Sequence, residues 1–264
     1  MGDDARSRDE DDLALITDAA RQAAAIALRF FRNDPKVWYK EGHSPVSEAD
    51  VAVDAFLERT LVAARPRYGW VSEETERRPG AGSRFFVVDP IDGTRCFLRG
   101  EEAWCISIAV VENERPVAGV VYAPVKHEEL TARCGGTALC NGSPIAVTPP
   151  PETGVLRLSA PDRMQRKLDH LPRLDFQTNA PSLAYRLSLV AMGRLDGTLI
   201  RARANDWDIA AGDLILERAG GLLIDVEGRQ RVYKFEGKRH GLLVAAARHA
   251  LDEFQHLGRL VDDA

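Results

Sequence analysis

One eight-residue segment, residues 87–94, constrains this 264-residue chain more than any other stretch. It reads Val-Val-Asp-Pro-Ile-Asp-Gly-Thr, which predicts a strand that ends at Asp89 in a sharp turn. Proline fixes its own φ, and Gly93 permits a φ that other residues resist. We expect the turn to bring the carboxylates of Asp89 and Asp92 and the carbonyl oxygen of Ile91 toward one point.

Oxygen ligands without sulfur or imidazole suit a hard cation such as Mg²⁺. The backbone amides of Gly93 and Thr94 are free to face an anion, and a phosphate that bridges cation and amides is the natural guest. The simpler interpretation is that Asp-Pro and Asp-Gly only reverse the chain, because both dipeptides are common in turns. The complete segment directly after a β-run, with Glu73 and Glu74 upstream, favours the metal interpretation.

Composition and charge exclude several classes of protein. Apolar residues make up 45% of the chain and charged residues 28%, as in an ordinary soluble globular protein. The net charge of −5 argues against general binding of nucleic-acid polymers, although a metal site can still attract a small anion. No apolar run is long enough for a membrane span, and the acidic residues 1–12 contain no hydrophobic signal. We expect residues 1–12 to be a frayed leader, the protein to be cytoplasmic and free of membranes, and the four scattered cysteines to be reduced.

Hydrophobic periodicity indicates layered helices and sheets. In the first half it predicts a helix over 12–31, a second helix that begins at a capping box at Ser47, and strands over 68–71, 84–88, 105–111, 117–122 and 129–134. Asn141-Gly142 is typical of a turn, and the proline-rich residues 148–151 form a linker between residues 1–150 and 151–264. In the second half we expect strands over 155–159, 195–200, 222–225 and 242–246, and helices over 163–170, 182–192, 207–219 and from Arg248 onward.

Further acidic residues are weak signals when taken singly. The Glu73-Glu74 pair could be a solvated loop edge. Asp50, and the Asp206–Asp208 pair that opens a helix, could be ordinary capping residues. Together with residues 87–94, however, they supply the surplus of carboxylates that two-metal phosphoryl chemistry requires. The six histidines fall outside these motifs, and Gly-x-Ser-x-Gly is absent, so direct attack by water is simpler than a serine nucleophile.

Three segments in this order are diagnostic: Ser72-Glu73-Glu74, residues 89–94 followed by Phe97, and Trp207-Asp-Ile-Ala-Ala-Gly212. With them the chain resembles the inositol monophosphatase superfamily of Mg²⁺-dependent, lithium-sensitive phosphatases, from about Leu13 to the C-terminus. The resemblance implies an α+β fold in the form of a layered αβαβα sandwich. It also implies two or three Mg²⁺ ions per site, inhibition by Li⁺, a small phosphate ester as substrate and a possible homodimer.

Site residues follow from the resemblance position by position. Those that match the metal ligands are Glu73, Asp89, Ile91 through its carbonyl, Asp92 and Asp208, with Asp89 as the bridge between two ions. Thr94 and Asp50 match the couple that activates water, Glu74 matches a supporting catalytic carboxylate, and Lys40 lies near a third metal position. The substrate would meet the amides of Gly93 and Thr94 and the side chains of Ser182, Arg186, Arg203 and Asp208.

The branch of the superfamily follows from segments around Ser44-Pro45, Trp70 and Gly193, which look most like the 3′(2′),5′-bisphosphate nucleotidases (CysQ). That branch acts on adenosine 3′,5′-bisphosphate, and Arg186, Arg201 and Arg203 could bind the second phosphate. Inositol monophosphatases share the motifs, and Arg95 is similar to the histidinol-phosphate group. Pro181-Ser182 departs from the usual Gly-Ser, with proline expected in the first helical turn. A degenerate ligand-binding regulator is the non-enzyme alternative.

Overall fold

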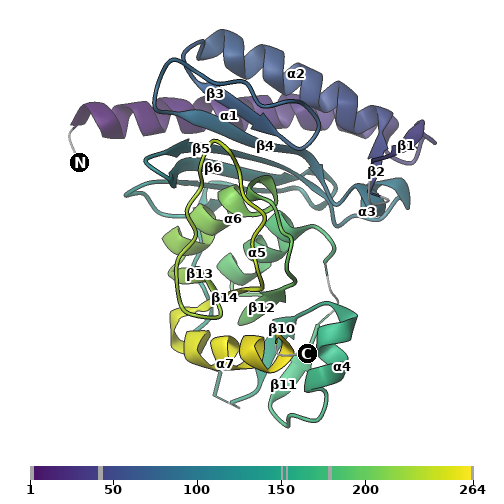
Figure 1. Ribbon diagram of the computed structural model, residues 1–264, viewed down its shortest axis with the longest axis vertical. Helices are drawn as coiled ribbons and strands as arrows, with labels where there is room; N and C mark the ends of the chain where they lie inside the picture. Colours follow the sequence, from purple (N-terminus) through teal and green to yellow (C-terminus); the bar gives the residue numbers. More distant parts are fainter. Residues whose placement is uncertain (1–2, 41–43, 150, 153, 178–179, 263–264) are drawn as a thin grey trace.

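The computed structural model describes residues 3–40, 44–149, 151–152, 154–177 and 180–262, which form five layers of helix, sheet, helix, sheet and helix (Figure 1). The predicted αβαβα sandwich is therefore confirmed. None of the described helices is both long enough and apolar enough to cross a membrane.

The larger sheet has seven strands in the order β3-β4-β5-β6-β7-β8-β9, and only β3 and β4 run parallel. Its outer face is covered by α1 (Asp3–Phe30) and α2 (Glu48–Ala64). The strands are β3 (Gly69–Ser72), β4 (Phe85–Asp92), β5 (Cys105–Glu112), β6 (Arg115–Ala123), β7 (Glu128–Arg133), β8 (Leu139–Cys140) and β9 (Ser143–Pro144). The predicted turn at Asn141-Gly142 joins β8 to β9, with both residues at positive φ.

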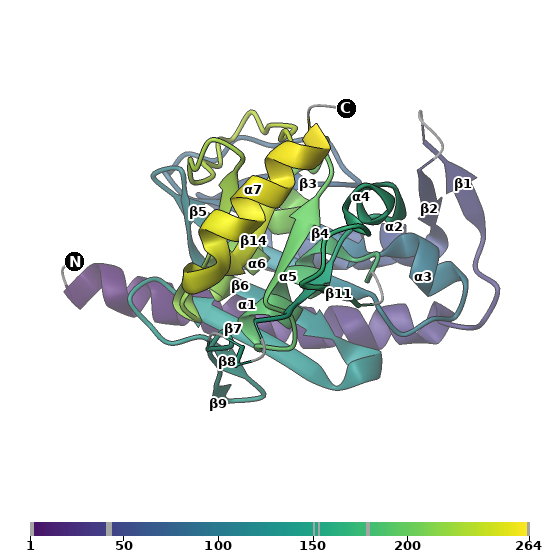
Figure 2. The same cartoon turned by 90° about the horizontal axis from the view of Figure 1, so that it is seen from below.

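The smaller sheet is mixed and has the order β11-β10-β12-β14-β13. Two helices lie between the sheets, α5 (Leu183–Ala191) and α6 (Asp206–Arg218), and two cover the outer face, α4 (Asp162–Leu168) and α7 (Leu251–Asp262) (Figure 2). The strands are β10 (Leu156–Ser159), β11 (Leu174–Phe176), β12 (Gly197–Ile200), β13 (Gly221–Asp225) and β14 (Leu243–Ala247). The remaining elements are the hairpin β1 (Val37–Tyr39) and β2 (Pro45–Ser47), the helix α3 (Thr94–Leu98) and 3₁₀ turns at Pro124–Lys126 and Arg248–Ala250.

Three hydrophobic cores fill the spaces between the five layers, because the middle core lies on both sides of the layer formed by α5 and α6. The alternation of side chains along each strand decides which core a residue faces. In β4, Phe86 and Val88 face the core under α1 and α2, whereas Phe85 and Val87 face the core around α5 and α6. The middle core also contains Leu243 from the smaller sheet, so the two sheets share it. The third core lies between the smaller sheet and α7. A domain boundary near residue 150 stays a prediction, and Pro150 itself lies outside the described residues.

The expectation of a frayed leader is wrong for residues 3–12, which belong to α1. Asp9 and Asp12 are buried, and the guanidinium of Arg84, the residue before β4, reaches both carboxylates at 2.7 Å. Arg65 and Tyr68 also donate to Asp12, each at 2.8 Å. These charge-assisted contacts compensate buried carboxylates and hold an otherwise polar helical segment against the sheet. Met1 and Gly2 lie outside the described residues.

Arg84→Ala should lower the free energy of unfolding by about 3–5 kcal/mol, because it removes the cationic partner of buried Asp9 and one of three donors to buried Asp12. Urea denaturation followed by circular dichroism measures this change. Arg99→Ala is the control, since Arg99 and Glu101 form an exposed pair that water screens, so its loss should change the free energy of unfolding far less. Equal effects of the two substitutions would contradict the stabilising role of Arg84.

Candidate metal centre and substrate cavity

A β-bulge in β4 places two acidic side chains on one face of the sheet. Asp89 pairs with Ser107 and Asp92 pairs with Cys105, so β4 carries one residue more than β5 between these pairs. Residues three apart normally project to opposite faces of a strand, and the extra residue brings both carboxylates to the face that packs on α6. The strand thus continues to Asp92 and does not end at Asp89 as predicted. Pro90 suits the bulge because it has no N–H to offer the ladder.

Gly93 follows directly in the left-handed region, with φ of +97°. A Cβ atom there would lie 3.0 Å from the carbonyl oxygen of Ala103 and 3.2 Å from Cβ of Ser182, so both the backbone conformation and the space require glycine. The short helix α3 begins at the next residue, Thr94. Gly93 and Thr94 line the cavity described below, and the roles of their amides as phosphate ligands stay predictions.

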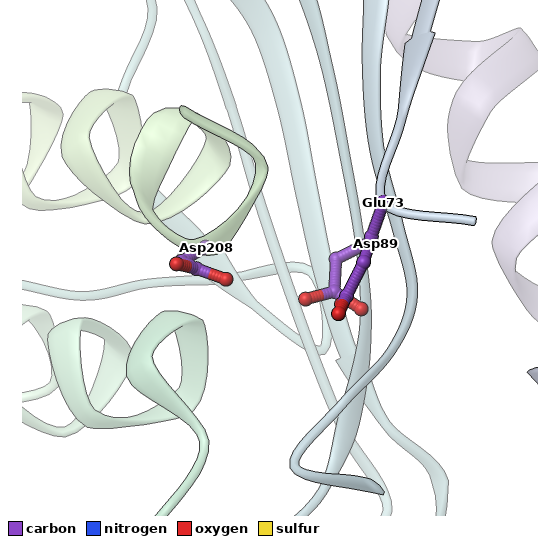
Figure 3. Close-up of side chains that lie close together, drawn as sticks. All are labelled: Glu73, Asp89 and Asp208. Carbon is purple, nitrogen blue, oxygen red and sulfur yellow. The ribbon is translucent and has the colours of Figure 1, made fainter. Parts of the chain in front are cut away.

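Three carboxylates from separate elements converge at this point (Figure 3). Glu73 follows β3, Asp89 lies in β4, and Asp208 lies in the first turn of α6 on the opposite side of the site. One oxygen of each lies within 4.8 Å of the others. Ile91, whose carbonyl oxygen is also predicted as a ligand, lines the same cavity, and this oxygen accepts a hydrogen bond from the hydroxyl of Thr94 at 3.1 Å.

Asp92 does not belong to this trio but lies beside it, held by the N-terminus of α5. Its Oδ2 accepts hydrogen bonds from Ser182 Oγ and from the backbone N–H of Ala184, both at 2.7 Å. Ser182 was expected to touch the substrate, but it is fully buried and caps α5 by accepting from Tyr185 N–H. The structure therefore places Ser182 behind Asp92, as a donor that orients it. Pro181 precedes the cap and is not in the first helical turn.

Asp50 makes the contacts that both interpretations of the sequence require, one with the cap of α2 and one with Thr94. Its Oδ2 accepts from the backbone N–H of Ser47 at 2.8 Å, which completes the predicted capping box of α2. Its Oδ1 accepts a hydrogen bond from Oγ1 of Thr94 at 3.1 Å. The two residues of the expected water-activating couple are thus in contact, and their catalytic role stays a prediction.

Lys40 lies between the two glutamates that follow β3. Its Nζ is 2.7 Å from Glu74 Oε1 and 3.3 Å from Glu73 Oε1. Burial opposes the charge of the ammonium group, but the two carboxylates outweigh it and raise the pKa of Lys40. Burial, with Glu73 as the adjacent charge, raises the pKa of Glu74 to about 7 despite this ion pair. Lys40 therefore neutralises only part of the local negative charge.

Burial and mutual repulsion raise the other acidic pKa values as well. Burial first, and neighbouring carboxylates second, raise the pKa of Asp89 and Asp208 well above the ordinary range. Burial raises the pKa of Asp92 to about 6 although it accepts hydrogen bonds, and that of Asp50 to about 6. Negative charge is thus concentrated where little water can screen it.

A bound divalent cation would offset the repulsion among these carboxylates. The donors are all oxygen atoms, they come from three carboxylates, and they converge on one point at the wall of a cavity. This donor set fits a hard ion such as Mg²⁺ and offers neither the sulfur nor the imidazole ligands typical of zinc. Glu73, Asp89 and Asp208 would hold the ion, with Asp92 and the carbonyl of Ile91 beside it.

The cavity has a volume of about 630 Å³ and combines this acidic centre with basic side chains. Arg186 from α5 is buried, and burial together with the charge of Arg201 lowers its pKa to about 10. Arg201 and Arg203 are exposed, and among the described residues their guanidinium groups have no hydrogen bond or ion pair. The arginines singled out from the sequence therefore do line the cavity, together with Arg95.

Sequence reasoning missed two residues near the site, Asn205 and His240. Asn205 donates its backbone N–H to Asp208 Oδ2 at 2.6 Å, and the spacing Asn-x-x-Asp of a capping box could have indicated this. Asp206 pairs with His240 at 2.7 Å, so one histidine does contact a motif. No sequence signal connects these two residues, because they are 34 positions apart.

Mg²⁺ should stabilise the protein more strongly as the pH rises. Asp50, Asp92 and Glu74 have higher pKa values folded than unfolded, so from about pH 4 to about pH 7 the metal-free folded state binds more protons and their contribution to stability falls with rising pH. A cation offsets the charge that appears over this window. Melting temperatures with EDTA and with Mg²⁺ at about pH 5 and about pH 7.5 measure the difference.

Asp89→Asn should remove most of the Mg²⁺-induced rise at the higher pH, because it removes one of three converging charges. Asp252→Asn, at an exposed position of α7, is the control and should leave the rise unchanged. A rise that is equal at both pH values, or is retained in Asp89→Asn, would contradict the assignment of the metal centre.

Comparisons with known proteins agree with this geometry. The model of the inositol monophosphatase family matches residues 9–257. A histidinol-phosphatase of Chlorobaculum parvum is 31% identical, with 86% of this chain and 90% of the relative covered, and an inositol-1-monophosphatase of Mesorhizobium japonicum is 33% identical, with 83% and 86% covered. A solved Thermotoga maritima IMPase superimposes with a TM-score of 0.86 at 26% identity, over 96% of this chain and 99% of that one. The chain belongs to the inositol monophosphatase family.

Proposed function

We propose that this protein is a Mg²⁺-dependent phosphomonoesterase that hydrolyses a small phosphate ester by direct attack of water. The observation that carries the proposal is the convergence of Glu73, Asp89 and Asp208 in a cavity that arginines also line. Membership of a family that contains histidinol-phosphatases and inositol monophosphatases supports it. We also propose sensitivity to Li⁺, a cytoplasmic location and a homodimer, on the basis of the family resemblance stated for the sequence.

Thr94 and Asp50 would act together in this reaction, beside the cation that the acidic residues would hold. Bound Mg²⁺ would supply positive charge to the phosphoryl oxygens and lower the pKa of water. Thr94 donates a hydrogen bond from its hydroxyl to Asp50 or to the carbonyl of Ile91, which leaves its oxygen free to accept a hydrogen bond from a water molecule. As that water attacks, its proton would pass to Thr94 and the hydroxyl proton of Thr94 would pass to the Asp50 carboxylate. Asp50 is ionised above its pKa of about 6 and can therefore hold this hydroxyl in the accepting orientation near neutral pH.

The arginines favour a substrate with a second anionic group, and we propose a 3′(2′),5′-bisphosphate nucleotide such as adenosine 3′,5′-bisphosphate. Arg201 and Arg203 present charged donors that the described part of the chain leaves unpaired. A guanidinium fork matches the geometry of phosphate. The second candidate is a monoester, inositol 1-phosphate or histidinol phosphate, and the names of the relatives favour it. A regulator that binds such a ligand without turnover is the non-enzyme alternative.

Thr94→Ala and Asp50→Asn should each lower kcat by several orders of magnitude, and the double variant should be little worse than the more damaged single variant. Residues that act as one unit give non-additive losses. Because Asp50 also closes the capping box of α2, melting temperatures are compared with kcat, and Thr94→Ala, which leaves that box intact, separates a loss of stability from a loss of activity. Losses that multiply fully would show that Thr94 and Asp50 act independently.

Arg201→Ala and Arg203→Ala should each lower kcat/KM for adenosine 3′,5′-bisphosphate by about ten- to a hundredfold, mainly through KM, because each removes a charged hydrogen bond to the second phosphate. Hydrolysis of inositol 1-phosphate should change by less than about threefold. Arg248→Ala, at an exposed arginine outside the cavity, is the control. A wild-type protein that prefers inositol 1-phosphate would overturn the bisphosphate proposal and leave the phosphatase proposal standing.

A further inference from the structure

Residues 226–242, between β13 and β14, leave the smaller sheet and run alongside α6 to the larger sheet (Figure 1). We call them the crossing segment. At its far end the backbone N–H of Tyr233 donates to the carbonyl oxygen of Glu114 at 2.9 Å. The ring of Phe235 packs edge-on against Phe85 of β4 at 5.8 Å between centroids. The crossing segment is therefore fastened to the larger sheet before it returns toward the site.

On its return toward the site, the crossing segment forms hydrogen bonds with Asp206, the first residue of α6. His240 Nε2 lies 2.7 Å from Asp206 Oδ1, and the backbone N–H of Lys238 donates to Asp206 Oδ2 at 3.1 Å. His240 and Asp206 are 3% and 2% exposed, so water cannot replace this contact readily. Since Asp206 uses both carboxylate oxygens here, its position is set by the crossing segment.

Backbone contacts also join the residues that precede Asp206 to His240 and its neighbour Arg239. Arg203 N–H donates to the carbonyl oxygen of His240 at 2.7 Å, and His240 N–H donates to the carbonyl oxygen of Ala204 at 2.9 Å. Asn205 and Arg239 form an antiparallel bridge. Residues 203–205, which line the cavity, are thus paired with residues 239 and 240.

Within this part of the cavity wall, Arg203 has a backbone conformation that residues with a Cβ atom rarely adopt. Arg203 has φ of +83°, in the left-handed region that disfavours residues with a Cβ atom. Such a conformation persists only where surrounding contacts hold it, and in the described part of the chain the backbone N–H of Arg203 donates to the backbone carbonyl oxygen of His240. Beyond Arg203, Asn205 donates to Asp208, so one continuous chain of contacts leads from His240 to the acidic centre.

We propose that His240 is a positioning residue, which through Asp206 and the paired backbone sets the placement of both Arg203 and Asp208. The inference rests on the proposed function, because it assigns these two residues to the second phosphate and to the cation. His240 does not line the cavity and acts only through its neighbours. Removal of the imidazole ring should therefore displace Arg203, which we assign to the second phosphate, together with Asp208, which we assign to the cation.

Tyr233 provides a matched control within the crossing segment. Its hydroxyl donates to Asp213 Oδ2 at 2.8 Å, and both groups are buried. Asp213 lies further along the same helix, away from the cavity. Tyr233→Phe therefore removes a buried hydrogen bond between the same two elements without touching the cavity wall.

The test compares His240→Ala, His240→Gln and Tyr233→Phe in the full-length protein. The first measurement is hydrogen exchange of the amides of residues 203–205 without substrate, and the second is KM and kcat for adenosine 3′,5′-bisphosphate and for p-nitrophenyl phosphate. In His240→Ala we expect amide exchange about tenfold faster or more, and a KM for the bisphosphate that rises about tenfold more than that for the monoester. His240→Gln should restore slow amide exchange and the wild-type ratio of the two KM values, because its amide nitrogen can donate to Asp206 from near the position of Nε2.

Tyr233→Phe should lower the melting temperature while it leaves the exchange at residues 203–205 and the ratio of the two KM values unchanged. Equal effects of His240→Ala and Tyr233→Phe on exchange and on that ratio would overturn the positioning role and leave a general effect on stability. If the wild-type protein hydrolysed no phosphate ester, the proposed function would fail. Faster amide exchange of residues 203–205 in His240→Ala than in Tyr233→Phe would then still show that His240 fixes the conformation of this part of the cavity wall.

Discussion

Repulsion among carboxylates that are buried or half-buried is the constraint around which this molecule is organised. Glu73, Asp89 and Asp208 converge although each resists a like charge in a poorly solvated place. Every one of them is held there by a donor from its surroundings: Lys40 for Glu73, the N–H of Ile91 for Asp89 and the N–H of Asn205 for Asp208. These donors orient the carboxylates but neutralise little of their charge, so the arrangement is one that a cation could stabilise without rearrangement of the side chains.

The sandwich architecture supplies this arrangement from two directions. The larger sheet contributes Glu73 and Asp89, and α6, which packs against that sheet, contributes Asp208. Asp92 is held at the same place by α5, whose N-terminus points at its carboxylate. Because the middle core joins both sheets to α5 and α6, displacement of either half alone would separate the ligands.

Much of this could be predicted from the sequence, because the strongest signals are local. Hydrophobic alternation located the main strands, the Ser47–Asp50 spacing located the start of α2, and oxygen-rich turns located the acidic centre. The bulge in β4 could not be predicted, since it depends on the register with β5. The burial of Ser182 and the pairing of His240 with Asp206 were likewise out of reach, because both depend on contacts between distant segments. Residues 3–12 were misjudged because their polarity suggests solvent, whereas Arg84 compensates the buried acids.

The double use of Asp50 and Asp208 bears on how a lineage of such proteins could lose its activity. Each closes a capping box at the start of a helix as well as facing the site. A descendant that had given up turnover would therefore still retain both aspartates to keep α2 and α6 intact. Glu73 caps no helix, and Asp89 lies inside a strand, so nothing in helix formation would preserve them. The presence of Glu73 and Asp89 is thus the more informative sign that a chain of this fold still performs chemistry.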